Sequence, residues 1–234
     1  MKNSRILTII PARGGSKGIK DKNIVDICGK PLIEYMINPA LELKKQGLVD
    51  EVIVSTDSEK IASISRQLGA AVPFLRPAEI SDDKAKSIDF VLHALDFFKN
   101  QEKFFDAVLL LQPTSPLRTT HQIDTAIKLF VENNADSLIS CYKEEYINDL
   151  VMYKKEKTGF LKPLNPLHNK GVRRQEHGEV FVRSGSIYIT KVGYLYATHQ
   201  IISDTPLLFE VTKSESINLD TLEDLKILRT LLCR

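Results

Sequence analysis

The sequence of 234 residues predicts an α/β fold, with a mostly parallel sheet and helices on both of its faces. Short apolar runs alternate with amphipathic helical patterns, which is the order that parallel strands with crossover helices require. These runs are continuously apolar rather than alternating, as in strands that are buried on both faces. Hydrophobic residues make up 43% and charged residues 26% of the chain, an ordinary globular composition that can form a large core.

Apolar stretches in the first half of the chain predict strands at residues 5–10, 51–56, 70–75 and 107–112. The last of these is the most apolar, and we expect it at the centre of the sheet. Apolar side chains three and four residues apart predict helices between the strands, at residues 31–47, 58–69 and 87–98. We expect Pro39 to kink the first helix, and Gly47 and Gly69 to end the first two.

The second half of the chain continues this order with an interruption. A helix is predicted at residues 122–134, a strand at 137–141 and another at 180–190. The chain then closes with a strand end that leads into a helix within residues 216–232. Its apolar side is expected to consist of Leu222, Leu225, Leu228 and Leu232.

Residues 142–179 interrupt the regular pattern. This segment is polar and contains Pro163, Pro166 and several glycines. A disordered insertion, a hairpin arm and an arm that docks on a second subunit would each have such a composition. We therefore predict a core made of residues 1–141 and 180–234, with an inserted arm at 142–179 that serves dimerisation and sugar contact.

The charge balance argues against a surface for nucleic acid or membranes. The net charge is +2, from 32 basic and 30 acidic residues, whereas such surfaces carry a larger or more clustered positive excess. The first apolar stretch, Ile6 to Pro11, is too short for a signal peptide or a membrane span, and no later run is long enough. These features predict a soluble, cytoplasmic protein without nucleic-acid or membrane partners.

The cysteines give no sign of a structural framework. Cys28, Cys141 and Cys233 are odd in number, lie far apart and form no C-x-x-C pattern. This spacing predicts neither a disulfide framework nor a zinc site. Cys28 and Cys141 have apolar neighbours and are expected to act as small core residues.

Polar clusters follow three of the predicted strands. They are Ala12–Gly14, Ser55–Asp57 and Gln112–Ser115. In open α/β sheets, ligands bind beyond the carboxyl ends of the strands, so these clusters are expected to meet at one site.

The loop after the first strand predicts an anion site. Gly14, Gly15 and Gly18 allow backbone N–H groups to turn toward one point, and Arg13 can hold a phosphate through two hydrogen bonds. A solvated basic turn is the alternative. The loop matches neither the P-loop pattern nor G-x-G-x-x-G, which argues against a P-loop ATPase and an NAD-dependent dehydrogenase.

Six blocks of the sequence resemble the family of CMP-sialic acid synthetases (N-acylneuraminate cytidylyltransferases, or CMP-nonulosonate synthetases). The blocks are IPARGGSKGIKDKN (10–23), VSTDS (54–58), LRPAEISDD (75–83), LLQPTSPLR (110–118), VRSGSIYI (182–189) and SINLDTLEDL (216–225). The resemblance implies a Rossmann-like core, a homodimer with an exchanged arm, and a magnesium-dependent reaction. In that reaction, CTP and a nonulosonic acid would give a CMP-sugar and pyrophosphate.

The resemblance also implies a set of nucleotide-binding residues. These are Arg13, Gly14, Ser16, Lys17, Lys22 and Asn23 in the loop, with Arg76 and Ser87 facing the nucleoside. Arg13 and Lys22 would stabilise charge at the α-phosphate and are therefore catalytic candidates. Asn23 offers the donor and the acceptor that cytosine recognition needs. A surface arginine and a helix N-cap serine are the respective alternatives for Arg76 and Ser87.

By the same resemblance, the acceptor sugar and its carboxylate would contact Gln112, Arg173, Gln175 and Arg183. Arginine suits this role because a carboxylate accepts a bidentate pair of hydrogen bonds. A strand-end amide at Gln112, and a solvated surface for the whole arm, are the alternatives. Thr114, Ser115 and Arg118 are expected to shape the turn that follows the central strand.

Asp220 is the candidate ligand for Mg²⁺ and the third catalytic candidate. Magnesium favours hard oxygen ligands, often one or two carboxylates together with substrate phosphates. The family's Asp-x-Asp pattern is here Asn218-Leu219-Asp220, so Asn218 would offer an uncharged amide oxygen. The alternative for Asp220 is an N-cap, with Glu223 completing a capping box.

Two further functions compete with this reading. CMP-Kdo synthetase catalyses the same kind of transfer, but it carries an acidic run where this chain has LLQPTSPLR. A nucleotide-binding protein without turnover is favoured by Asn218 alone and opposed by the cationic loop and Asp220. Within the preferred reading, sialic, legionaminic and pseudaminic acids all remain open as the sugar.

Overall fold

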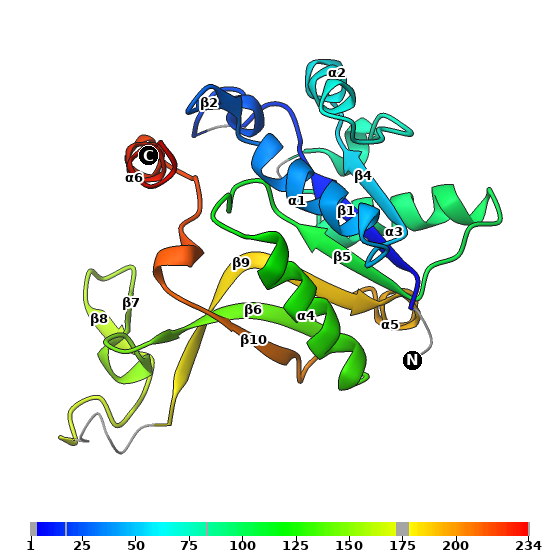
Figure 1. Cartoon of the computed structure of the whole chain (residues 1–234). Coiled ribbons are helices and arrows are strands. Elements are labelled where there is room, and N and C mark those ends of the chain that lie inside the picture. Colours follow the sequence, from blue (N-terminus) through cyan, green and yellow to red (C-terminus); the bar gives the residue numbers. More distant parts are fainter. Residues whose placement is uncertain (1–3, 17, 83, 172–177, 234) are drawn as a thin grey trace.

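The computed structural model describes residues 4–16, 18–82, 84–171 and 178–233. Its centre is a six-stranded sheet in the order β10-β6-β9-β5-β1-β4 (Figure 1). β9 runs antiparallel to both of its neighbours, and the other adjacent pairs are parallel. The predicted α/β fold with a mostly parallel sheet is therefore confirmed. The strands are β1 (Ile6–Pro11), β4 (Glu51–Ser55), β5 (Ala107–Leu111), β6 (Ser137–Glu144), β9 (Val180–Lys191) and β10 (Leu207–Val211).

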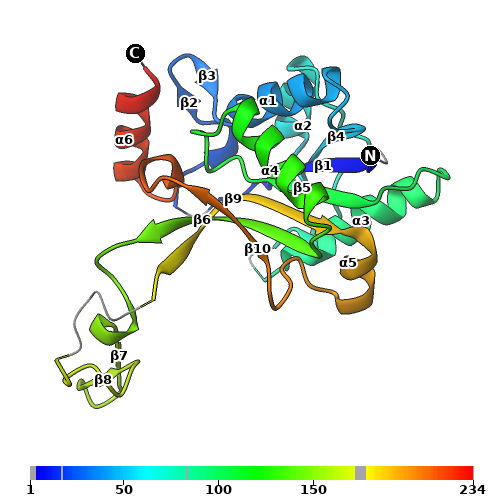
Figure 2. The same ribbon diagram turned by 60° about the horizontal axis from the view of Figure 1, so that its bottom comes forward.

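Helices cover both faces of the sheet (Figure 2). α1 (Glu34–Lys45), α2 (Glu59–Gln67) and α4 (Thr120–Glu132) pack on one face, and α3 (Ser87–Lys99) and α5 (Val192–Thr198) pack on the other. Along β1, Ile6 and Ile10 join the first of these layers, whereas Leu7 and Ile9 join the second. Because side chains alternate between two buried faces, apolar residues fill the strand apart from Thr8, which is buried as well.

The elements predicted in the first half of the chain form, with one exception. β5 lies between β9 and β1 in the middle of the sheet, as expected. Pro39 lies inside α1, and the helix continues through it. The strand predicted at residues 70–75 is wrong, because this stretch makes only isolated bridges at Ala71 and Leu75. Pro73 lacks the N–H group that a continuous ladder would need beside β4.

The second half contains elements that the pattern did not indicate. α5 and β10 were not predicted, and β10 extends the sheet by pairing with β6 in parallel. The strand end expected near residue 216 is instead a 3₁₀ turn at Ser214–Ser216, before α6 (Leu222–Leu232). Leu225 and Leu228 are buried as predicted, but Leu222 is 65% exposed at the first turn of the helix. None of the helices in the described parts of the chain is long and apolar enough to span a membrane.

α6 packs on a small hairpin formed by β2 (Asp26–Ile27) and β3 (Lys30–Pro31). A disulfide joins Cys28 in the hairpin turn to Cys233 at the end of α6, with their Cα atoms 5.3 Å apart. The prediction that the cysteines form no disulfide is therefore wrong. Spacing detects local patterns, whereas these two residues lie 205 positions apart and meet only through the fold. Cys141 is buried and unpaired, as expected of a core residue.

The segment predicted as an arm leaves the core between β6 and β9. It carries a short hairpin of β7 (Tyr153–Lys155) and β8 (Leu161–Pro163), which projects from the body of the molecule in Figures 1 and 2. The described part of this segment thus contains a hairpin. The arm bears exposed apolar side chains, including Phe160 (77% exposed) and Leu161 (63%).

Candidate active site

A pocket of about 430 Å³ opens beyond the carboxyl ends of β1 and β5. It brings together residues from the loop after β1, the start of α3, the turn after β5 and the segment before α6. The predicted site residues that line it are Arg13, Ser16, Lys22, Asn23, Arg76, Ser87, Gln112 and Asp220. Lys17, Arg173 and Gln175 lie outside the described residues.

Backbone contacts shape the loop after β1. The N–H group of Gly14 donates to Oδ1 of Asp57 over 2.8 Å, which ties the loop to the end of β4. Asn23 is 6% exposed, and its Nδ2 donates to the carbonyl oxygen of Arg13 over 2.9 Å. A Cβ atom at Gly18 would lie 2.8 Å from the carbonyl oxygen of Asp220. Glycine is therefore needed where the loop passes the segment before α6.

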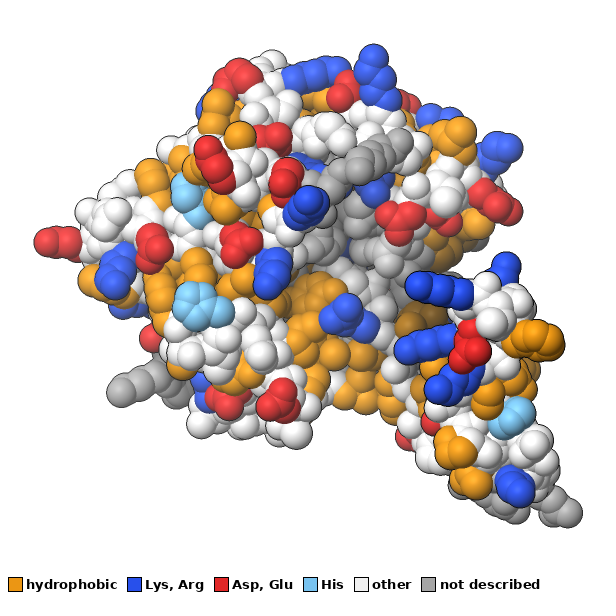
Figure 3. All heavy atoms as spheres, turned by 180° about the vertical axis from the view of Figure 1, so that it is seen from behind, with side chains coloured by type: hydrophobic (Ala, Val, Ile, Leu, Met, Phe, Trp, Pro, Cys, Tyr) orange, Lys and Arg blue, Asp and Glu red, His pale blue; other side chains and the backbone are white. Residues whose placement is uncertain are grey.

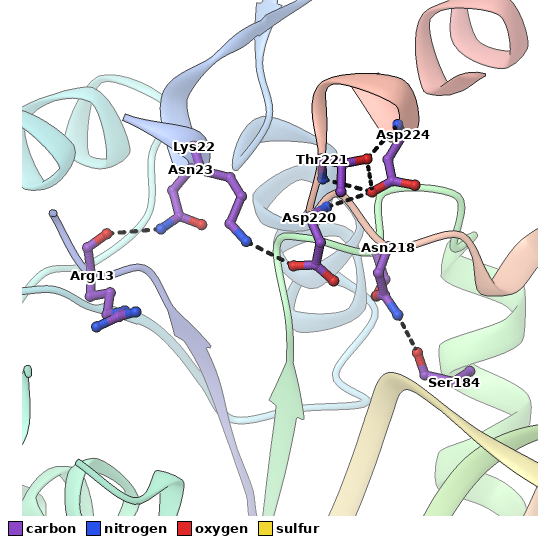
Figure 4. A network of polar contacts seen from close by, with 9 residues as sticks. Arg13, Lys22, Asn23, Ser184, Asn218, Asp220, Thr221 and Asp224 are labelled. Atoms are coloured by element: carbon purple, nitrogen blue, oxygen red, sulfur yellow. Dashed lines mark hydrogen bonds and ion pairs between the residues drawn. The ribbon is translucent and has the colours of Figure 1, made fainter. Parts of the chain in front are cut away.

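Lys22 and Asp220 form an ion pair at this crossing. Nζ of Lys22 lies 3.0 Å from Oδ1 of Asp220, and the two side chains are 19% and 71% exposed. Figure 4 shows Lys22 pointing from its loop toward the Asp220 carboxylate, with Arg13 and Asn23 on the far side of Lys22. Two of the three catalytic candidates are thus in direct contact.

The cap of α6 explains how Asp220 reaches the pocket. Thr221, not Asp220, is the N-cap: its Oγ1 accepts from the N–H of Asp224, and Oδ2 of Asp224 accepts from the N–H of Thr221. The alternative for Asp220, a capping box with Glu223, is therefore wrong by one position. Because Thr221 caps the helix, the carboxylate of Asp220 lies in the pocket instead of on the first turn.

Asn218 bridges two other parts of the site. Its Oδ1 accepts from the hydroxyl of Ser115 after β5, and its Nδ2 donates to the carbonyl oxygen of Ser184 on β9 over 2.9 Å (Figure 4). The N–H of Leu219 donates to the carbonyl of Thr114 over 2.7 Å. These contacts fix the segment that carries Asp220 against the central strands.

The donor set around Asp220 fits a magnesium ion that takes most of its ligands from substrate. One protein carboxylate together with phosphate oxygens is a usual magnesium environment. No group of three or more His, Cys, Asp or Glu side chains gathers in the described segments, so a cage made of protein alone is not present there.

Arg76 is not a surface arginine, since it is 6% exposed. Its Nε donates to Oγ of Ser55 over 3.1 Å, and its NH2 group donates to the carbonyl of the same residue. The guanidinium lies 4.4 Å from the centre of the Phe90 ring. Burial lowers the pKa of Arg76 to about 10, so the group stays charged at neutral pH. Its place at the pocket wall agrees with the predicted nucleoside contact.

The turn after β5 has the structural role predicted for it. Arg118 is 5% exposed, and it donates to the carbonyl oxygens of Gln112 and Ser115. Burial lowers the pKa of Arg118 to about 9. The turn is therefore rigid where it presents Gln112 to the pocket.

A second, smaller pocket of about 220 Å³ adjoins the first. Ser87 and Gln112 line both pockets, and Arg183 of β9 lines the smaller one. Ser87 is the first residue of α3 and Lys86 is its N-cap, so the N-cap alternative for Ser87 is wrong. Arg183 and Gln112, the two described sugar candidates, thus share a wall.

Sequence reasoning missed several residues of these walls. Asp82 and Phe90 line the larger pocket, and Tyr188 lines the smaller one. Asp82 lies within the quoted LRPAEISDD block, which could have drawn attention to it. Phe90 and Tyr188 look like ordinary core residues of a helix and a strand, so no local signal marks them.

Comparison with known proteins gives a consistent result. A family model described as cytidylyltransferase matches residues 7–226. Pseudaminic acid cytidylyltransferase of Campylobacter jejuni subsp. jejuni is 32% identical, over 99% of this chain and 96% of its own. CMP-N,N'-diacetyllegionaminic acid synthase of Legionella pneumophila is 34% identical, over 93% of this chain and 91% of its own. N-acylneuraminate cytidylyltransferase of Streptococcus agalactiae is 30% identical, over 93% of this chain and 51% of its own.

Solved structures share the fold at lower identity. CMP:2-keto-3-deoxy-manno-octonic acid synthetase complexed with CTP has a TM-score of 0.71 at 19% identity, covering 98% of this chain and 99% of that one. 4-Diphosphocytidyl-2C-methyl-D-erythritol synthase from Anaerococcus prevotii has a TM-score of 0.66 at 14% identity, covering 100% of both chains.

Proposed function

The chain belongs to the cytidylyltransferase family, and on that premise we propose that it joins CTP to a nonulosonic acid. The products are a CMP-sugar and pyrophosphate. The relatives that match most of this chain are named for pseudaminic and legionaminic acids, and a third is named for N-acylneuraminic acid. This spread of names supports the class of sugar and leaves the individual acid to experiment.

The observation that carries the proposal is the convergence of Arg13, Lys22 and Asp220 in one pocket at the carboxyl end of the sheet. A nucleoside triphosphate brings several negative charges, which the two cations can neutralise. The carboxylate of Asp220 would repel a phosphate group, because both are negatively charged. It can instead bind a divalent cation that accompanies the nucleotide.

In the proposed mechanism, the C2 hydroxyl oxygen of the sugar attacks the α-phosphorus, and the bond from this phosphorus to the leaving pyrophosphate breaks in line. The hydroxyl proton passes to water. Arg13 and Lys22 stabilise the negative charge that develops on the phosphate oxygens, and the fixed pocket supplies orientation. Asn23, Arg76 and Ser87 position the nucleoside. Gln112 and Arg183 position the sugar from the adjoining pocket, where the guanidinium can pair with the sugar carboxylate.

Mg²⁺ is the proposed cofactor, held by the carboxylate of Asp220 and by substrate phosphates. When bound, it supplies positive charge beside the phosphates. Asn218 is the second predicted ligand. Both ends of its amide already bond to the protein, so we propose that Asn218 would act mainly by positioning Asp220.

The chain is further proposed to act as a cytoplasmic homodimer through the segment at residues 142–179. Figure 3 shows the arm standing away from the body across a hollow, with hydrophobic side chains among the basic ones on its surface. Ile147, Phe160 and Leu161 are more than half exposed there. A second copy of the chain would remove these apolar side chains from water.

The proposal is tested by measuring pyrophosphate release with Mg²⁺, CTP and a nonulosonic acid, leaving out one component at a time. Release is expected only when all three are present. Asp220→Asn should lower kcat by about a hundredfold or more, the scale of losing one preorganised charge contact. Glu223→Gln, the same kind of change in the first turn of α6, is the control and should keep its activity. Full turnover of Asp220→Asn at saturating Mg²⁺ would contradict the role of Asp220.

A further inference from the structure

The Lys22–Asp220 ion pair points to a coupling between nucleotide and metal binding. This inference rests on the proposed function. We propose that the ammonium of Lys22 occupies, in the nucleotide-free protein, the position of a cation beside Asp220. The phosphates of the nucleotide then draw Lys22 away and release the carboxylate for a divalent cation. Lys22 thus takes the place of a metal cation beside Asp220 until the nucleotide binds. The nucleotide and the divalent cation therefore bind cooperatively.

Both partners of the pair are held by the fold. Lys22 begins a 3₁₀ turn with Asn23, whose buried amide is bonded to the carbonyl of Arg13. Asp220 directly precedes the capped start of α6, and its carbonyl lies against Gly18. The Nζ–Oδ1 distance of 3.0 Å joins segments that are 198 residues apart in sequence. Each side chain therefore starts from a fixed backbone position, and only the end of Lys22 has to move.

The charges of the pocket explain why a divalent cation should bind weakly before the nucleotide. Arg13, Lys22 and Arg76 line the pocket with positive charge, against the carboxylates of Asp82 and Asp220. Oδ1 of Asp82 already accepts from two backbone N–H groups of its own turn. The carboxylate of Asp220 is neutralised by Lys22, so an arriving cation meets net repulsion.

Bound phosphates reverse this balance. Their negative charge competes with Asp220 for the ammonium of Lys22, and their oxygens complete the ligand set that a single carboxylate leaves short. Binding of one ligand then strengthens binding of the other. By thermodynamic linkage, the nucleotide strengthens binding of the cation by the same factor by which the cation strengthens binding of the nucleotide.

The test measures Mn²⁺ binding to the nucleotide-free protein, by the loss of the free-ion signal in electron paramagnetic resonance. Lys22→Gln and Lys22→Met both remove the charge while keeping a long side chain. Each is expected to bind Mn²⁺ roughly tenfold more tightly than the wild type, since the competing ammonium is gone. Adding Asp220→Asn to either variant should abolish the gain.

Two further variants serve as controls, one that keeps the charge at position 22 and one that removes a charge outside the pocket. Lys22→Arg retains a cation beside Asp220 and should bind Mn²⁺ as weakly as the wild type. Lys60→Gln breaks the exposed pair between Lys60 and Asp21, 2.7 Å apart in the same loop region but outside the pocket lining, and should change nothing.

The inference is overturned if a folded Lys22→Gln or Lys22→Met variant binds Mn²⁺ no more tightly than the wild type. It is also overturned if the gain survives Asp220→Asn. Neither measurement uses CTP or a sugar. A failure here therefore leaves the proposed reaction untouched, and a failure of pyrophosphate release leaves this result standing.

Discussion

Arg76 combines burial with a place at the pocket wall. Its guanidinium satisfies both the hydroxyl and the carbonyl of Ser55 and lies over the ring of Phe90. A lysine could not form this planar fork, which explains the use of arginine. The same side chain therefore supports the end of β4 and presents positive charge to the pocket, where we propose that the nucleotide binds.

Arg76→Ala is expected to lower the free energy of unfolding by about 2–3 kcal/mol, because it removes two hydrogen bonds to Ser55 and opens a cavity. The carbonyl of Ser55 keeps the N–H of Ala12 as its donor. Urea denaturation measures this loss. Arg66→Ala on α2 removes an arginine whose ion pair with Glu59 is exposed, and should cost no more than about 0.5 kcal/mol. Equal losses in the two variants would contradict the structural role of Arg76.

The sequence predicted which residues gather at the pocket better than it predicted their contacts. The loop and the family resemblance pointed to Arg13, Lys22 and Asp220, and all three line the pocket. The ion pair between Lys22 and Asp220 was not evident, because the spacing of residues within one segment says nothing about contacts across 198 positions. Phe90 and Tyr188 were missed because a pocket wall and a core look alike in sequence.

Among the elements, α6 matters most for the site because its start fixes Asp220. The reciprocal cap of Thr221 and Asp224 replaces the predicted box at Asp220 and Glu223. The one-residue shift has a functional consequence, since a carboxylate used as a cap would be directed at the helix N–H groups. Here Asp220 pairs with Lys22 instead.

Thr221→Ala should therefore lower stability by about 1 kcal/mol and also reduce kcat, because α6 frays where it positions Asp220. Thr119→Ala is the matched control: Thr119 caps α4 in the same way, with Gln122 as its partner, and lies outside the pocket lining. It should lose similar stability and keep its activity. Thermal unfolding and pyrophosphate release, measured on both variants, separate the two effects. Equal losses of activity in the two would argue against the positioning role of α6.

Acid stability should depend on Glu144 at the root of the arm. Its carboxylate accepts from Nζ of Lys213 over 2.7 Å and from the N–H of Tyr146 over 3.0 Å. These contacts hold the pKa of Glu144 at about 2, below its ordinary value of 4.5. Because the folded pKa is the lower one, the contribution to stability is complete above about pH 4.5 and disappears as the pH falls toward 2.

The difference in urea midpoint between the wild type and Glu144→Gln should thus be larger at about pH 7 than at about pH 3. Glu179→Gln breaks the pair of Glu179 with Lys143, in which Glu179 is 64% exposed, and should shift the midpoint little at either pH. A Glu144→Gln difference that stays constant with pH would contradict the assignment.

The predictability of the elements follows from burial. β1, β5 and the long helices were predicted because packing on the sheet imposes a clear apolar pattern. α5 and β10 are short, and β10 is an edge strand of the sheet, so their patterns are weak. Residues 70–75 show the reverse error, because an apolar stretch next to β4 cannot form a ladder through Pro73.

Across the whole molecule, the Cys28–Cys233 disulfide ties the end of α6 to the hairpin that follows the loop after β1. Lys22 lies before the β2–β3 hairpin and Asp220 lies before α6. The disulfide therefore links the two segments that carry this ion pair. Long-range pairing of this kind cannot be deduced from cysteine spacing, which explains why the sequence analysis excluded it.

Reduction of the disulfide should lower stability by about 2–5 kcal/mol, the usual range for a bond that closes a long loop. The measurement is chemical denaturation with and without reductant. Cys233→Ser should be insensitive to reductant, whereas Cys141→Ser should respond as the wild type does. A wild-type protein that unfolds identically in both conditions would contradict a stabilising role.

The most direct test of the central claim compares kcat/KM for a panel of acids with CTP and Mg²⁺, followed by pyrophosphate release. The panel holds N-acetylneuraminate, N,N'-diacetyllegionaminate, pseudaminate and Kdo. We predict that one of the three nonulosonates reacts with a clearly higher kcat/KM than Kdo and yields its CMP derivative. Preference for Kdo, or binding of CTP without turnover of any acid, would contradict the proposed function.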